Sequence, residues 1–249
     1  MVQLSHLEPF ARGGNRLCYV HPDDPQCCIK VRRPDFTLKD CRRKKGFPRN
    51  LRPLSYFDDN REEQEVITHL RETRGERIHQ HIYRCDGFIE TDLGPGLLTE
   101  LVRDADGRIS VSLKQELWER GYPEPTRQAV EVLGAFWLDY LIPSRELLTH
   151  NIVVQKDSNG DICRLVVIDG LGSPNLLPFD WLPKSVRRHK VAQRLRRLRK
   201  RIRQFIRRCD SGHEPSRVGM LRYRGKSQPC GAAMIASCCP LPARGKCTP

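Results

Sequence analysis

Two acids and an amide lie at the ends of two short apolar runs in the middle of the chain. Glu146 and Asn151 precede the run Ile152–Val154. Asp169 follows the run Leu165–Ile168. The runs are separated by a turn with Ser-Asn-Gly, which is typical of a β-hairpin. Because Mg²⁺ prefers a few oxygen ligands plus phosphate oxygens, this stretch predicts a Mg²⁺–nucleotide site.

A lysine and a glutamate from the first third of the chain are candidates to join this site. Lys30 lies in a strand-like run between two apolar residues, and the preceding strand follows a Gly13-Gly14 turn whose amides can approach a bound group. Glu63 shares a helical face with apolar residues, where an acid needs a cationic partner such as Lys30. The alternative is that Lys30 faces solvent and that Glu63 only charges the first turn of its helix.

The elements that must position these groups follow from hydrophobic periodicity and turn residues. Residues 34–58 are basic and irregular, and they predict a loop or a short helix. Trp118 is expected on the apolar side of its helix. The predicted elements are strands His6–Ala11, Leu17–Val20 and Cys27–Val31, a helix from Asp59, strands His79–Ile89 and Gly96–Val102, helices Leu113–Arg120 and Gln128–Leu141, the hairpin, and a basic helix.

The composition bounds the class of protein. The chain has 249 residues, enough for one substantial domain or two small lobes, and a mean hydropathy of −0.58. No run approaches the roughly 18 apolar residues of a membrane span, and no signal peptide is visible, so we expect a cytoplasmic protein. The 11 cysteines include no C-x-x-C pair, which favours reduced thiols over a metal site.

The net charge of +14 is concentrated near the C-terminus. The predicted helix over 184–208 is rich in Lys and Arg and has no acid. Its apolar residues recur at helical spacing, which favours docking on the rest of the chain. The alternatives are contact of Val186–Arg208 with an anionic membrane surface and, least favoured because no aromatic residues are interleaved, nucleic acid. Residues 209–249 lack periodicity and predict a disordered tail. The apolar stripe comprises Val191, Leu195, Leu198, Ile202 and Phe205.

A Gly turn, a strand lysine, a helix glutamate, an acid-x4-Asn loop and a strand-Asp-Gly follow one another as in a protein-kinase-like catalytic domain. More closely, the sequence resembles the family named for the PhoP regulatory network protein YrbL. The resemblance runs from about Leu4 to Pro183. The stretches that carry it are PFARGGNRLCYVHP, CIKVRRPD, NLRPLSYFDDN, TDLGPGLLTELVRDADGRIS, IPSRELLTHNIVVQ and VVIDGLGS.

This resemblance implies an α+β, protein-kinase-like two-lobed fold with a minimal helical C-lobe. The N-lobe would span 1–102 and a reduced C-lobe 103–183, followed by the basic amphipathic helix over 184–208 and the tail over 209–249. The family also implies a bacterial, cytoplasmic, kinase-like protein linked to the PhoP magnesium-starvation response. The implied cofactors are ATP and Mg²⁺.

The resemblance also implies roles on the nucleotide side. Lys30 looks like the phosphate-holding lysine, with the Gly13-Gly14 turn covering the phosphates. Glu63 looks like its helix partner, with Glu62 in reserve. The hinge that meets adenine would run from Glu100 to Val102.

The implied metal ligands are Asn151 and Asp169. Arg145 and Glu146 fall where kinases have Arg-Asp, so Glu146 would orient or deprotonate an acceptor hydroxyl.

The sequence also departs from the kinase pattern near the acceptor. Ser144 replaces the usual loop histidine, Glu146 is one methylene longer than aspartate, and Gly170 directly follows Asp169. Two functions therefore stay open. One is ATP-dependent phosphotransfer to a protein or small-molecule hydroxyl. The other is a catalytically weak or inactive pseudokinase that acts as a regulatory binding module.

Overall fold

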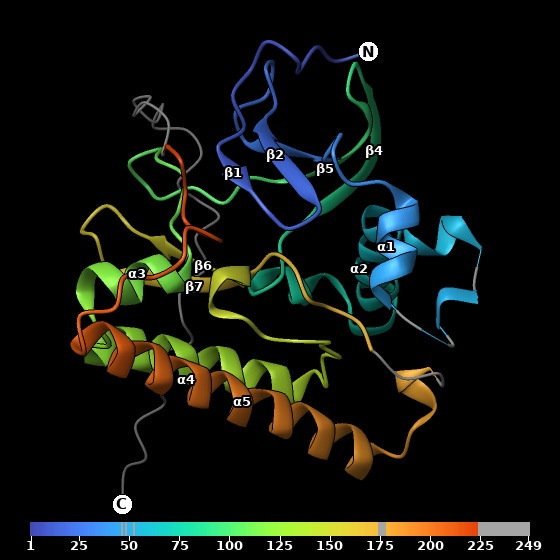
Figure 1. The fold of residues 1–249 in the computed structure, drawn as a ribbon. Coiled ribbons are helices and arrows are strands. Elements are labelled where there is room, and N and C mark those ends of the chain that lie inside the picture. Colours follow the sequence, from blue (N-terminus) through green and yellow to red (C-terminus); the bar gives the residue numbers. More distant parts are fainter. Residues whose placement is uncertain (46, 48, 52, 174–177, 224–249) are drawn as a thin grey trace, which may run out of the picture.

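An antiparallel sheet forms one end of the molecule, and helices form the other (Figure 1). The structure is a computed structural model that describes residues 1–45, 47, 49–51, 53–173 and 178–223. The strand order is β1-β2-β3-β5-β4, and all neighbours are antiparallel. The strands are β1 (Ala11–Arg12), β2 (Arg16–Val20), β3 (Cys27–Arg32), β4 (Cys85–Thr91) and β5 (Gly94–Glu100).

Two predicted strands are shorter than expected. The strand predicted over His6–Ala11 is wrong before Ala11, because the backbone amide of Leu4 donates to Asp92 and the next residues turn. The strand predicted from His79 begins only at Cys85. The residues before it form the 3-10 helix η3 (Glu76–Gln80) and then hydrogen-bond to strand β7 (Ile162–Val167), so they leave the sheet.

Helix α2 (Asp59–Arg74) packs beside the sheet and begins at Asp59, as predicted. The Asp58 carboxylate accepts a hydrogen bond from the Asn60 amide, and Gly75 ends the helix with a φ of 81°. Glu63 is buried together with apolar residues of the same face. The basic stretch before α2 contains the short elements α1 (Leu38–Lys45), η1 (Arg49–Leu51) and η2 (Leu54–Phe57).

The other end of the molecule combines a hairpin with three helices. The prediction of helix α3 is confirmed at both ends, but Trp118 is 40% exposed, so its predicted orientation is wrong. Leu117, one position earlier and about 100° away on the helix, faces the core instead. The elements are α3 (Leu113–Arg120), α4 (Glu124–Asp139), η4 (Thr149–Asn151), β6 (Ile152–Lys156), β7 (Ile162–Val167), η5 (Phe179–Trp181) and α5 (Lys184–Asp210).

The basic helix α5 lies beside α4 and belongs to the largest hydrophobic core (Figure 1). Its residues Val191, Leu195, Leu198 and Ile202 are all buried there, at the spacing that the sequence shows. Burial of one face leaves the basic side chains on the others. Docking on the rest of the chain is therefore confirmed for these four residues. Phe205 is partly buried and packs against the same core.

The predicted α+β class is confirmed by the sheet and these helices. Within the described part of the chain, no helix is both long and apolar enough to cross a membrane. The tail predicted over 209–249 is described up to residue 223. Its described part makes defined contacts with α3 and the sheet instead of extending freely. Residues 224–249 lie outside the described residues.

Candidate functional site

Lys30 and Glu63 form a buried ion pair between β3 and α2. The Lys30 ammonium donates to Glu63 Oε1 at 2.7 Å, and the two side chains are only 8% and 4% exposed. The same ammonium donates to the backbone carbonyl of Ile168 at 2.9 Å. The contact between Lys30 and Glu63 that the sequence predicts is thus present, and Lys30 also links the sheet to the end of β7.

Arg16 is a third charged residue of this cluster, and the sequence reasoning missed it. Its guanidinium, 13% exposed, pairs with the second oxygen of Glu63 and, at 2.9 Å, with Asp169 Oδ2. Burial lowers the pKa of Arg16, but the two carboxylates raise it well above its ordinary value. Cys18 of β2 lies opposite Lys30 of β3. Because alternate residues of a strand share a face, Arg16 lies on the same face as Cys18 and Lys30, and this alternation is visible in the sequence.

Asp169 lies directly after the hairpin, as predicted, and is held as a carboxylate. Burial raises the pKa of Asp169, but Arg16 and Lys30 outweigh this and lower it below its ordinary value. The amide of Gly170 donates to Asp169 Oδ1 at 2.6 Å. Gly170 has a φ of 83°, and a Cβ there would collide with the carbonyl oxygen of Glu146. Glycine therefore lets the chain after Asp169 pass against the loop that carries Glu146.

Asn151, the second predicted metal ligand, lies at the end of η4 close to Gly170. Its side-chain nitrogen would be 3.4 Å from a Cβ at Gly170. Its backbone carbonyl accepts from the Ile168 amide at 2.9 Å, which fixes it at the mouth of the hairpin. The structure thus brings Asn151 and Asp169 to the same mouth, on either side of Gly170.

The loop before the hairpin contains the residues predicted to act on an acceptor. Glu146 is half exposed and pairs with Arg201 of α5 at 2.9 Å. Arg145 pairs with Glu62 of α2 at 2.7 Å and donates to the Leu171 carbonyl. The loop is therefore tied to two helices.

Ser144 stands where the kinase pattern has a loop histidine, and its side chain is buried. Its hydroxyl accepts a hydrogen bond from the Trp137 indole at 2.8 Å. Serine here anchors the loop on α4 by a hydrogen bond.

The predicted hinge joins the sheet to the helical end, but its side chains diverge. Both oxygens of Glu100 are bonded, to the Arg164 guanidinium and to the Arg84 amide, each at 3.0 Å. Val102 faces the large core, whereas Leu101 faces the sheet side. Leu101 is therefore the hinge residue whose side chain can contact a group beneath the sheet.

A group of apolar side chains, which we call the inner cluster, lies against the inner face of the sheet and includes Leu101. On β2, alternation places Arg16, Cys18 and Val20 on one face, spanning about 13 Å from the charged cluster toward the hinge. A bound molecule of that length would meet charge at one end and apolar side chains at the other. The inner cluster comprises Phe10, Cys28, Leu101 and Ile109 with partly buried Ala11, Cys18, Val20 and Leu221.

The Gly13-Gly14 turn lies between β1 and β2, as predicted. The Gly13 amide donates to the Arg16 carbonyl, and the Gly14 carbonyl accepts from Arg33. A Cβ on Gly13 would come no closer than 3.6 Å to another group, and one on Gly14 would meet nothing within 4 Å. The fold itself therefore does not require glycine at either position, and their phosphate-covering role stays a prediction.

The donor set suits a metal ion that arrives with phosphates. Asp169 offers an ionised, 39% exposed carboxylate, and Asn151 offers an amide oxygen. Across the described residues, no group of three or more His, Cys, Asp and Glu side chains is placed to hold a metal. Mg²⁺ commonly uses one or two carboxylates and takes its other ligands from phosphate and water. Asn151 and Asp169 fit that pattern.

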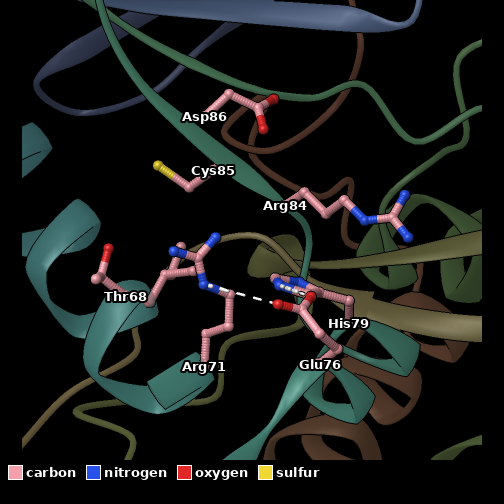
Figure 2. A pocket seen from close by; sticks show the side chains of 8 residues that line it. Thr68, Arg71, Glu76, His79, Arg84, Cys85 and Asp86 are labelled. Atoms are coloured by element: carbon pink, nitrogen blue, oxygen red, sulfur yellow. Dashed lines mark ion pairs between the residues drawn. The ribbon is translucent and has the colours of Figure 1, made fainter.

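A separate recess of about 50 Å³ is lined by residues of α2, η3 and the start of β4 (Figure 2). Three of the residues that line it, Arg71, Glu76 and His79, contact one another. The Glu76 carboxylate lies 3.8 Å from Arg71 and 3.7 Å from His79. His79 also bonds to the Ile82 carbonyl, so its ring is already engaged. The recess contains none of the predicted site residues.

Comparison with known proteins identifies the family. A family model described as "PhoP regulatory network protein YrbL" matches residues 2–203. The chain belongs to this family. It is also 30% identical over 186 residues to "Uncharacterized protein YrbL" of Escherichia coli (strain K12), which covers 72% of this chain and 77% of that protein. The protein of the same name from Shigella flexneri matches equally.

The YrbL family match includes the charged residues and the candidate metal ligands described above, from Arg16 to Asp169, and most of α5, whereas Leu221 of the inner cluster lies outside it. The resemblance of the sequence to the YrbL family is thereby confirmed. The match ends at residue 203, so the segment after α5 lies beyond the part of the chain that the family model covers.

Proposed function

We propose that this chain is a kinase-like protein that binds ATP and Mg²⁺ and transfers phosphate to a protein or small-molecule hydroxyl. The observation that carries the proposal is the buried Lys30–Glu63 pair at 2.7 Å, which reaches Asp169 through Arg16. A protein-kinase-like site couples a strand lysine, a helix glutamate and a metal-binding aspartate in this way. The membership in the PhoP regulatory network family supports a regulatory setting.

The nucleotide would extend along β2, with its phosphates near Lys30 and its base against the inner cluster. Lys30 and Arg16 would neutralise phosphate charge. Asn151 and Asp169 would hold Mg²⁺, which supplies charge neutralisation between phosphate oxygens. Asp169 can take up this role only when it releases Arg16, which now bonds one of its oxygens.

The acceptor side would use the loop that carries Glu146. This carboxylate would orient the acceptor hydroxyl and take its proton as the phosphoryl group moves to the acceptor oxygen and ADP leaves. Arg145, paired with Glu62, would keep the loop aligned with α2. The 52% exposure of Glu146 leaves it accessible to an acceptor.

The second candidate is a nucleotide-binding regulator without transfer. It is favoured by the ion pair between Glu146 and Arg201, because this contact occupies a carboxylate oxygen that would have to accept the acceptor's proton. In this candidate the exposed basic face of α5 contacts an anionic surface. The cytoplasmic location expected from the sequence suits both candidates.

Thermal unfolding with and without ATP–Mg²⁺ tests the binding proposal. Ligand at 100 times its Kd adds about 2.7 kcal/mol, which raises the Tm of a chain of this size by roughly 5–10 °C. We expect this rise for the wild type and little rise for Lys30→Ala and Asp169→Ala. Asp180→Ala is the control, since Asp180 is also ion-paired but lies near the start of α5. An equal rise in all four proteins would show that ATP binds elsewhere.

Transfer is tested separately with labelled ATP and candidate acceptors. If the wild type binds ATP without turnover, and Glu146→Asp creates none, the regulator without transfer is the better function. Turnover that disappears in Glu146→Gln while ATP binding persists would establish phosphotransfer.

A further inference from the structure

The segment that follows α5 turns back across the molecule. Residues 212–223, which we call the strap, rise from the end of α5 past α3 toward the sheet, drawn in orange to red in Figure 1. The strap passes the loop that carries Asn151, because Gly219 packs directly on His150. It therefore connects the acceptor side of the candidate site with the sheet.

Side chains at the start of α3 hold the middle of the strap. The Lys114 ammonium is buried and donates to the carbonyls of Ser216 and Val218, at 2.6 and 2.8 Å, and to the Ser216 hydroxyl at 3.0 Å. The Ser112 hydroxyl donates to the Gly219 carbonyl at 2.6 Å. A buried lysine charge is costly unless it is hydrogen-bonded, and here the strap supplies its three acceptors.

The end of the strap lies on the inner cluster. Leu221 packs against that cluster, and its amide donates to the Gln115 side chain at 3.3 Å. The next amide, of Arg222, donates to the Phe10 carbonyl at 2.9 Å, and the Tyr223 hydroxyl donates to the Glu8 carbonyl at 3.0 Å. These contacts fix Leu221 at the apolar end of the β2 face, opposite the charged cluster.

We propose that the strap is a built-in competitor of the nucleotide base, with Leu221 covering the apolar surface on which the base must pack. The inference rests on the proposed function, because it concerns the regulation of the same site. The strap leaves Lys30, Glu63 and Asp169 untouched, so it acts on the base end alone. Nucleotide binding then requires release of the strap, and anything that holds the strap elsewhere activates the site.

Gly219 gives a way to release the strap without altering the inner cluster. It has a φ of 75°, and a Cβ there would collide with the side chain of His150. Gly212, at the start of the strap, has a similar φ of 78° but open space around it. Gly219→Ala should therefore displace the strap, and Gly212→Ala is its matched control for backbone strain.

Leu221→Asp is the second releasing variant, since it puts a charge against apolar side chains. Val218→Asp is its control, because Val218 is 51% exposed on the same strap. Two measurements are made on the full chain: the Kd for ATP–Mg²⁺ by calorimetry and the alkylation rate of Cys18 by peptide mass spectrometry. The hydrogen bond with Cys28 lowers the pKa of Cys18 to about 7, so this thiol reacts at neutral pH when reached.

The two releasing variants should each lower the Kd at least tenfold and speed Cys18 alkylation at least tenfold, while both controls stay within twofold of the wild type. If wild type and releasing variants bind ATP equally tightly and alkylate equally fast, the strap proposal is overturned and the proposed function stands. If alkylation accelerates while no protein binds ATP, the strap covers the cluster as inferred, and it is the proposed nucleotide function that fails.

Discussion

The charged cluster beneath the sheet and the ion pair on the acceptor loop differ in burial. Lys30, Glu63 and Arg16 are between 4% and 13% exposed and share their hydrogen bonds. Glu146 and Arg201 are 52% and 34% exposed and form one contact. Removal of one charge from the first group leaves its partners unpaired in the interior. The Glu146–Arg201 pair can separate with little effect on the fold. The fold therefore holds the residues proposed to bind phosphate rigidly and leaves the residue proposed to act on an acceptor adjustable.

This contrast has a physical basis in desolvation. A buried charge that loses its partner stays out of water. Removing one partner of a buried ion pair therefore lowers the free energy of unfolding by about 3–5 kcal/mol. An exposed pair is worth about 0–1 kcal/mol, because water replaces the partner. Of the departures of the sequence from the kinase pattern, Glu146 falls on the exposed side, where it least disturbs folding, whereas Ser144 is buried and bonds to Trp137.

The largest expected effect is that of Glu63→Gln. Glutamine keeps the shape but removes the charge that Lys30 and Arg16 share, so two buried cations face an amide. We expect a loss of about 3–5 kcal/mol in the free energy of unfolding, measured by urea denaturation. Glu62→Gln is the matched control on the same helix. Glu62 is 31% exposed and, among the described residues, forms its ion pair with Arg145, so the loss for Glu62→Gln should stay below about 1 kcal/mol.

Equal losses for the two glutamates would break the comparison between a buried and an exposed group. The same experiment repeated in 1 M NaCl sharpens it. Salt screens exposed pairs more than buried ones, so the small effect of Glu62→Gln should shrink while that of Glu63→Gln persists.

An intermediate effect is expected from pH at Asp169. The folded-state pKa of Asp169 is lowered below its ordinary value, so the ionised form is favoured in the folded protein. Its stabilisation is therefore present above about pH 4 and is lost as the pH falls through the folded-state pKa. We expect the urea midpoint of the wild type to fall more steeply from pH 6 to pH 3 than that of Asp169→Asn. Parallel pH profiles would show that Arg16 does not hold this carboxylate in solution.

Local patterns in the sequence predict much of this arrangement. The apolar stripe of α5 and the bounds of α3 depend on patterns within one element. The partnership of Lys30 with Glu63 follows from the inward position that helical periodicity gives to Glu63, and all three predictions are seen in the structure. Periodicity does not decide which of two neighbours faces the core at a helix end. For that reason the sequence predicts Trp118 on the core side of α3, where the structure has Leu117.

The residues that the sequence does not reveal are those whose partners lie far along the chain. Strand alternation puts Arg16 on the face of Lys30, but no pattern in the sequence pairs it with Asp169, 153 residues later. The strap is polar and lacks periodicity, and it is held chiefly through its backbone carbonyls by Lys114 and Ser112. Composition describes side chains, so it misses a segment whose order depends on backbone acceptors.

The smallest expected effect on folding is that of Arg201→Ala, and it separates stability from activity. The pair with Glu146 is half exposed, so its loss should change the free energy of unfolding by less than about 1 kcal/mol. Removing Arg201 frees the Glu146 oxygen that its guanidinium now binds. If Glu146 acts on the acceptor, Arg201→Ala should therefore change turnover at fixed ATP–Mg²⁺ affinity. Arg199→Ala is the control, since Arg199 pairs with Glu131 of α4 on another side of the helix. A change in ATP affinity without a change in turnover would show that α5 acts on the nucleotide side, and the division between the two regions would then be wrong.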